Sequence, residues 1–163
     1  MNGTRAVRIL PVKLAIIIAI ILTIAAIATL AKSESAAAES KKTELLHIES
    51  AWVRPAWGKS GLTAGYATIV NQASTPDRLI AISSAAAKAV ELHASDMKDG
   101  ISRMRRQETF EIQAAGSLLF APGGNHIMFI GLKEPMIEGG KISVTFTFER
   151  AGVLTIDMPV IKH

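Results

Sequence analysis

The sequence of 163 residues contains no cysteine. This absence excludes a disulfide scaffold, a cysteine-ligated zinc or iron–sulfur site, a cysteine nucleophile and the His₂Cys site of a blue-copper electron carrier. The chain also lacks the motifs typical of a serine-hydrolase elbow, a P-loop, a zinc protease and a dinucleotide-binding loop. Because no nucleophile–base set is legible either, we expect a protein that is not an enzyme.

A basic excess is confined to the N-terminal segment. Residues 1–43 contain six Lys and Arg against two Glu, whereas residues 44–163 contain twelve basic and twelve acidic residues. The net charge of +4 therefore belongs to the segment that precedes the folded domain. The basic pI predicts neither nucleic acid nor an anionic surface as a partner of that domain.

A long apolar run follows three basic residues near the N-terminus. Residues 14–31 are apolar except for two threonines. A positive segment followed by an apolar run is typical of a secretory signal, yet this run is also long enough to span a bilayer. Two interpretations stay open for residues 1–31, a cleaved signal peptide and an uncleaved inner-membrane anchor. Both predict a periplasmic or other extracytoplasmic domain, with residues 32–43 as a linker.

Residues 44–163 carry the pattern of a β protein. Apolar and polar residues alternate in short runs that turn-forming residues separate, and only residues 84–89 look helical. On one face of the first run we expect Leu46, Ile48, Ser50 and Trp52. The expected strands are 45–54, 64–71, 78–83, 90–93, 118–120, 126–132, 142–148 and 154–160, the last two forming a hairpin. This spacing predicts an antiparallel β-sandwich or barrel.

Methionine and histidine gather in one part of this domain. Between residues 93 and 136 the chain contains His93, Met97, Met104, His126, Met128 and Met136. Thioether sulfur is a soft ligand that suits Cu(I), and imidazole suits copper in either oxidation state. His126 and Met128 are two residues apart in an expected strand, so they share one face and leave Ile127 and Phe129 for the core. A single methionine is more often a packing residue, so this interpretation depends on the whole set.

The set has a defined spacing. Ten residues separate His93 from Met104, twenty-one separate Met104 from His126, and one separates His126 from Met128. This pattern, H-x10-M-x21-H-x-M, resembles the motif of the periplasmic copper chaperones that supply the binuclear copper centre of cytochrome c oxidase. The similarity extends over about residues 45–160 and includes the segments 48–55, 65–66, 75–79, 90–93, 122–128, 131–133 and 146–152.

The resemblance implies a cupredoxin-like β-sandwich that binds one Cu(I) ion through His93, Met104, His126 and Met128. Members of this family pass copper to an oxidase subunit or to a thioredoxin-like copper assembly protein. We expect a monomer that meets the membrane only through the N-terminal segment, if that segment is uncleaved. Two other functions stay open: a copper storage or tolerance protein, and a structural or adhesive module in which these residues only pack.

For the remaining methionines and histidines we expect other roles or environments. Many members of the family have a methionine directly after the first histidine, where this chain has alanine, and Met97 is then either a spare ligand for copper transfer or a surface residue. His163 alone does not make the second copper site that a His- and Met-rich tail provides. We expect Met136 to be exposed in a turn, Met158 to lie in the core and His47 to lie on the surface.

Overall fold

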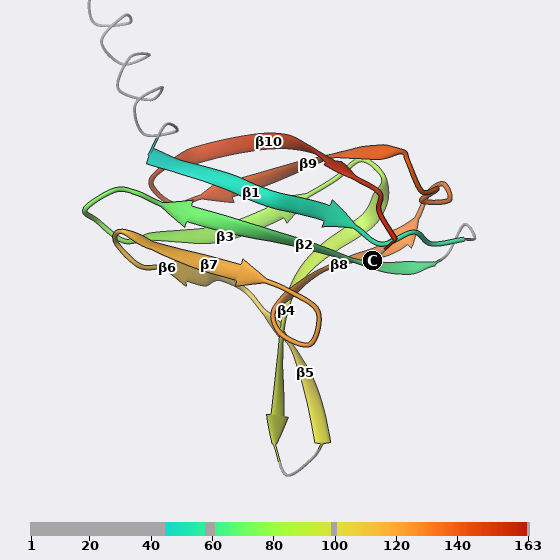
Figure 1. The fold of residues 1–163 in the computed structure, drawn as a ribbon, viewed down its shortest axis with the longest axis horizontal. Helices are drawn as coiled ribbons and strands as arrows, with labels where there is room; N and C mark the ends of the chain where they lie inside the picture. The colour runs from blue at the N-terminus through green and yellow to red at the C-terminus, as the bar shows by residue number, and fades with distance from the viewer. Residues whose placement is uncertain (1–44, 58–60, 99–100, 163) are drawn as a thin grey trace, which may run out of the picture. The chain divides into compact units, whose positions relative to one another are not determined.

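The computed structural model describes residues 45–57, 61–98 and 101–162 (Figure 1). The expected signal or anchor, the linker and His163 lie outside these ranges. All elements assigned within them are strands: β1 (Leu46–Val53), β2 (Leu62–Asn71), β3 (Asp77–Ser83), β4 (Ala87–Lys98), β5 (Ile101–Gln107), β6 (Phe110–Ile112), β7 (Gly116–Phe120), β8 (His126–Leu132), β9 (Lys141–Phe148) and β10 (Gly152–Pro159). In the described part of the chain, no helix is long and apolar enough to cross a membrane.

Two antiparallel sheets enclose the core. One sheet has the strand order β1-β2-β8-β4-β5, with β7 paired to β2, and the other has the order β10-β9-β3-β6. Phe129 of the first sheet and Phe146 of the second are both fully buried in the shared apolar core. The expected all-β antiparallel architecture is therefore confirmed.

The strand that carries two of the predicted ligands has the predicted bounds, His126–Leu132. Its alternate residues Ile127 and Phe129 are fully buried, as the sequence pattern predicted. The C-terminal hairpin is also confirmed, because β9 and β10 pair from Lys141↔Pro159 to Phe148↔Gly152.

The helical expectation for residues 84–89 is wrong. Ala87 begins β4, and it pairs with Leu132 while Ala89 pairs with Ile130. Alanine has the highest intrinsic helix propensity, but this preference is small and the ladder hydrogen bonds to β8 outweigh it. The strand expected over residues 90–93 is consequently much longer than its apolar pattern suggested.

The alternation expected along β1 is wrong after Ser50. Ser50 has a φ of 50°, and the pairing with β2 shifts register between Glu49 and Trp52. Such a β-bulge exchanges the two faces of the strand beyond it. Val53 is therefore fully buried, and the rings of Trp52 and Tyr66 lie 4.6 Å apart with their planes inclined at 43°.

Two methionines outside the predicted ligand set are buried. Met158 is fully buried, as expected for the last strand. Met136 was expected to be exposed, but only 3% of its surface is accessible. The loop that contains Met136 folds back on the chain, because Met136 N donates to Ala56 O at 2.8 Å and Ala56 N donates to Met136 O at 3.0 Å.

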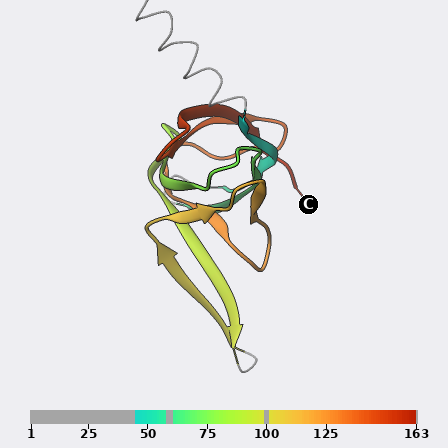
Figure 2. The same cartoon turned by 90° about the vertical axis from the view of Figure 1, so that its left-hand side faces the viewer.

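The β4–β5 hairpin extends beyond the rest of the sandwich, as Figures 1 and 2 both show. β4 pairs with β8 from Ala87 to His93, and with β5 from Leu92 to Lys98. His93 therefore lies where β4 leaves β8 and continues as half of a two-stranded hairpin.

Candidate metal centre

His93 and His126 meet across β4 and β8. The two residues are direct partners in the antiparallel ladder, and their ring centroids are 5.6 Å apart with planes inclined at 38°. His126 is 6% exposed and the side chain of His93 is 15% exposed. The structure thus brings together the two predicted histidines, and both imidazoles have little access to water.

The two predicted thioether ligands lie on the same face of the sheet as this pair. Met128 follows His126 by two residues in β8 and is half-buried. Met104 lies opposite Ser95, which follows His93 by two residues in β4. Side chains two residues apart share a face, and paired residues project to the same side. The two methionines therefore flank the histidines in opposite directions along β4.

Each imidazole has one engaged nitrogen and one nitrogen without a partner. Nδ1 of His126 donates to the carbonyl oxygen of Gly124 at 2.9 Å, and Nε2 of His93 donates to Oε2 of Glu91 at 2.9 Å. Because both acceptors are oxygens without a hydrogen to give, the hydrogen of each ring lies on the engaged nitrogen.

The other two nitrogens are suited to a metal ion. Nδ1 of His93 and Nε2 of His126 are buried and have no hydrogen-bond partner. A buried polar atom without a partner costs stability unless something else binds it. A ring nitrogen that carries a lone pair, on an imidazole held by an outer acceptor, is the usual form of a metal-ligating histidine. These residues therefore fit a metal ion.

Glu91 and Arg106 form an outer layer that the sequence analysis missed. The carboxylate of Glu91 contacts His93 through one oxygen, and its other oxygen lies 3.4 Å from Nη1 of Arg106. Glu91 could have been found, because it precedes His93 by two residues in a strand and so shares its face. Arg106 could not, because its contact depends on the pairing register of β4 with β5.

The described residues include no group of three or more His, Asp or Glu side chains placed to hold a metal ion. His47 lies apart on β1 with 36% of its side chain exposed, in agreement with the expected surface position. The side chains of Met97 and His163 lie outside the description, so their roles stay predictions.

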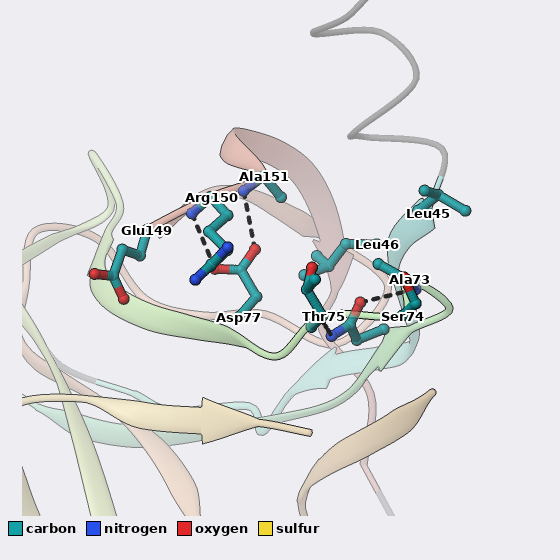
Figure 3. A pocket seen from close by; sticks show the side chains of 10 residues that line it. Leu45, Leu46, Ala73, Ser74, Thr75, Asp77, Glu149, Arg150 and Ala151 are labelled. Atoms are coloured by element: carbon teal, nitrogen blue, oxygen red, sulfur yellow. Dashed lines mark hydrogen bonds between the residues drawn. The ribbon is translucent and has the colours of Figure 1, made fainter. Parts of the chain in front are cut away.

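A separate pocket is lined by buried polar side chains that hold the fold together (Figure 3). Asp77 accepts hydrogen bonds from the backbone N–H groups of Arg78, Arg150 and Ala151 at 2.7, 3.0 and 2.9 Å. Asn71 likewise bonds backbone groups of the adjacent loops. These two buried polar side chains thus have partners within the protein and join β2 and β3 to neighbouring loops.

Residues 46–160 match the protein family described as "Putative lipoprotein LpqE-like". The "Putative lipoprotein Lxx21020" of Leifsonia xyli subsp. xyli is 35% identical over 127 residues, which cover 77% of this chain and 75% of that protein. The protein RP573 of Rickettsia prowazekii is 29% identical over 108 residues, which cover 64% of this chain and 60% of that protein.

Solved structures share this fold. The copper-bound PCuAC domain from PmoF2 matches with a TM-score of 0.62 at 28% sequence identity, over 73% of this chain and 94% of that domain. The solution structure of apo-DR1885 from Deinococcus radiodurans matches with a TM-score of 0.57 at 24% identity, over 73% of this chain and 80% of that protein. The strands are thus arranged as in PCuAC domains, and the chain belongs to the LpqE-like family.

Proposed function

We propose that the protein is an exported, non-enzymatic Cu(I) metallochaperone that binds one ion through His93, Met104, His126 and Met128. The observation that carries this proposal is the pair of buried nitrogens without partners, Nδ1 of His93 and Nε2 of His126, flanked by two thioethers. Two soft sulfurs and two imidazoles suit Cu(I), and they contain no thiolate that an oxidising compartment would consume. The similarity to a domain described as copper-bound supports the choice of metal.

Delivery requires that the ion leave by ligand exchange. Met104 is 56% exposed on the β4–β5 hairpin, whereas His126 is buried. An incoming ligand of an acceptor can therefore displace the Met104 thioether first, while the remaining ligands still hold the ion. This exposure favours transfer over storage, because a storage site gains from enclosing its metal. We propose a copper-accepting subunit of a haem–copper oxidase, or a thioredoxin-like copper assembly protein, as the acceptor.

The proposed place of work is the periplasm or another extracytoplasmic compartment. The apolar run over residues 14–31 is suited to a signal or an inner-membrane anchor. The description of the family and of the Leifsonia relative as lipoproteins also supports an exported location.

Competition titration of the full chain with a Cu(I)-specific chromophoric chelator tests the site. We expect one equivalent of tightly bound Cu(I), and we expect Met104→Leu/Met128→Leu to weaken binding by at least about tenfold, or ~1.4 kcal/mol. Met136→Leu is the matched control, since it removes a buried thioether that is not part of the predicted ligand set. Unchanged affinity in the double variant would show that the ligand set is wrong.

Delivery is tested in cells that lack the gene. A chaperone predicts loss of haem–copper oxidase activity when copper is scarce, and rescue by added copper. A storage or tolerance protein predicts normal oxidase activity and sensitivity to excess copper, which would contradict the delivery role.

A further inference from the structure

We infer that Glu91 is a positioning residue that fixes the tautomer and orientation of His93, and that Arg106 in turn holds Glu91. This role rests on the proposed copper site, but the contacts of Glu91 with His93 and Arg106 exist in the protein without metal. Both residues lie outside the predicted ligand set.

Glu91 and His93 are in direct contact. These residues are two apart in β4, and Oε2 of Glu91 lies 2.9 Å from Nε2 of His93. Their side chains are 22% and 15% exposed, so water competes only weakly for this bond. A carboxylate oxygen can only accept, and it therefore places the hydrogen on Nε2 and the lone pair on Nδ1. Nδ1 is the buried nitrogen without a partner.

The two histidines are held through different ring nitrogens by different acceptors. His126 is held through Nδ1 by the backbone carbonyl of Gly124, so its free nitrogen is Nε2. The nitrogen without a partner is therefore Nδ1 in His93 and Nε2 in His126. No substitution of a side chain removes the carbonyl that orients His126. His93 in contrast depends on the Glu91 side chain, so its orientation can be changed by mutation.

Arg106 contacts Glu91 from the neighbouring strand β5. This residue lies directly opposite His93 in the β4–β5 ladder, and its Nη1 is 3.4 Å from Oε1 of Glu91. The guanidinium thus contacts the oxygen that His93 leaves free, which holds the carboxylate between the two strands. Because the side chain of Arg106 is 67% exposed, its contribution should be smaller than that of Glu91.

The chain provides an internal control for this arrangement. His47 and Glu49 are also two residues apart in a strand, with Nε2 and Oε1 separated by 2.8 Å. Their side chains are 36% and 55% exposed, and they lie on β1 rather than among the predicted ligands. Substitution of Glu49 therefore removes a similar His–Glu contact without touching the copper site.

Long-range ¹H–¹⁵N NMR of the full apo chain, at a pH well above the usual histidine pKa of about 6.5, reports the tautomer of each ring directly. We expect His93 to carry its hydrogen on Nε2 in the native protein. Glu91→Gln should not preserve this tautomer fully, because the Gln amide can donate to the ring as well as accept from it. Glu91→Ala should give a mixture of tautomers, and Glu49→Ala should leave His93 unchanged. A native His93 with hydrogen on Nδ1, or an unchanged tautomer in Glu91→Ala, would overturn the inference.

Cu(I) titration of the same variants gives a second readout. Loss of an outer partner of a ligating histidine typically costs roughly 10- to 100-fold in metal affinity, so we expect that loss in Glu91→Ala. Arg106→Met should cost less than about tenfold. Equal affinity in Glu91→Ala and the native chain would contradict the positioning role. If the native chain binds no Cu(I) but shows the expected tautomers, the proposed function fails and the role of Glu91 in orienting His93 stands.

Discussion

His93 and His126 face each other at the point where β4 leaves β8, with ring centroids 5.6 Å apart. One side of the candidate metal centre therefore belongs to the packed sandwich, where Ile127 and Phe129 anchor β8 in the core. The other side belongs to the β4–β5 hairpin, which carries the exposed Met104. The proposed site would therefore combine buried predicted ligands with an exposed one, Met104, that the proposed acceptor can reach.

The difference in exposure predicts an order of oxidation. Peroxide should convert Met104, which is 56% exposed, to the sulfoxide before it reaches Met136 and Met158, which are 3% and 0% exposed. Sulfoxide formation follows access and replaces a soft thioether with a polar group, so Cu(I) affinity should fall with it. Graded oxidation of the apo protein, with peptide mass spectrometry and Cu(I) titration, measures both effects. Equal rates for Met104 and Met136, or full affinity after oxidation of Met104, would contradict the prediction.

Gly65 packs so closely against Phe129 of β8 that a larger side chain does not fit without a shift. A Cβ atom at this position would lie 2.8 Å from Cε2 of Phe129, whose ring is fully buried. Gly65→Ala must displace that ring, and we expect a loss of about 1–3 kcal/mol in the free energy of unfolding. Gly124→Ala is the control, because its Cβ would lie 3.7 Å from the carbonyl oxygen of Ala121 and should change stability by less than about 1 kcal/mol. Urea unfolding measures both, and equal effects would refute the packing argument.

Asp77 makes stabilising hydrogen bonds that are separate from the candidate metal centre. Its buried carboxylate accepts backbone hydrogen bonds from Arg150 and Ala151, which ties the β9–β10 turn to β3. Asp77→Ala should cost roughly 3 kcal/mol, because it removes these bonds and leaves N–H donors without partners. Glu149→Ala removes a carboxylate of the same pocket that is 51% exposed in its ion pair with Arg78, and it should cost less than about 1 kcal/mol. Denaturant unfolding tests the stability, and folded Asp77→Ala should keep the native Cu(I) affinity.

Part of the fold could be predicted from alternation, because several predicted strands bury alternate residues. β8 has its predicted bounds, and the β9–β10 hairpin has the predicted inward residues Val144, Phe146 and Met158. β5 could not be found in this way. As the edge of its sheet and half of a projecting hairpin, it has exposed residues on both faces, and its Arg-rich sequence shows no apolar alternation. The bulge at Ser50 could not be predicted either, because no local residue pattern requires it.

The candidate site was likewise only partly predictable from the sequence. The spacing of the two histidines and two methionines, together with the family resemblance, was enough to name the four predicted ligands. Sequence could not show that His93 lies opposite His126, because that pairing joins strands 33 positions apart in the chain. The partner of each ring nitrogen, and hence which nitrogen is free, also depends on tertiary structure.

X-ray absorption spectroscopy at the copper K edge of the Cu(I)-loaded full chain identifies the ligand atoms of the proposed site. We expect a first shell with both nitrogen and sulfur scatterers, two of each, and loss of the sulfur contribution in Met104→Leu/Met128→Leu. A first shell of nitrogen and oxygen alone in the native protein would contradict this expectation.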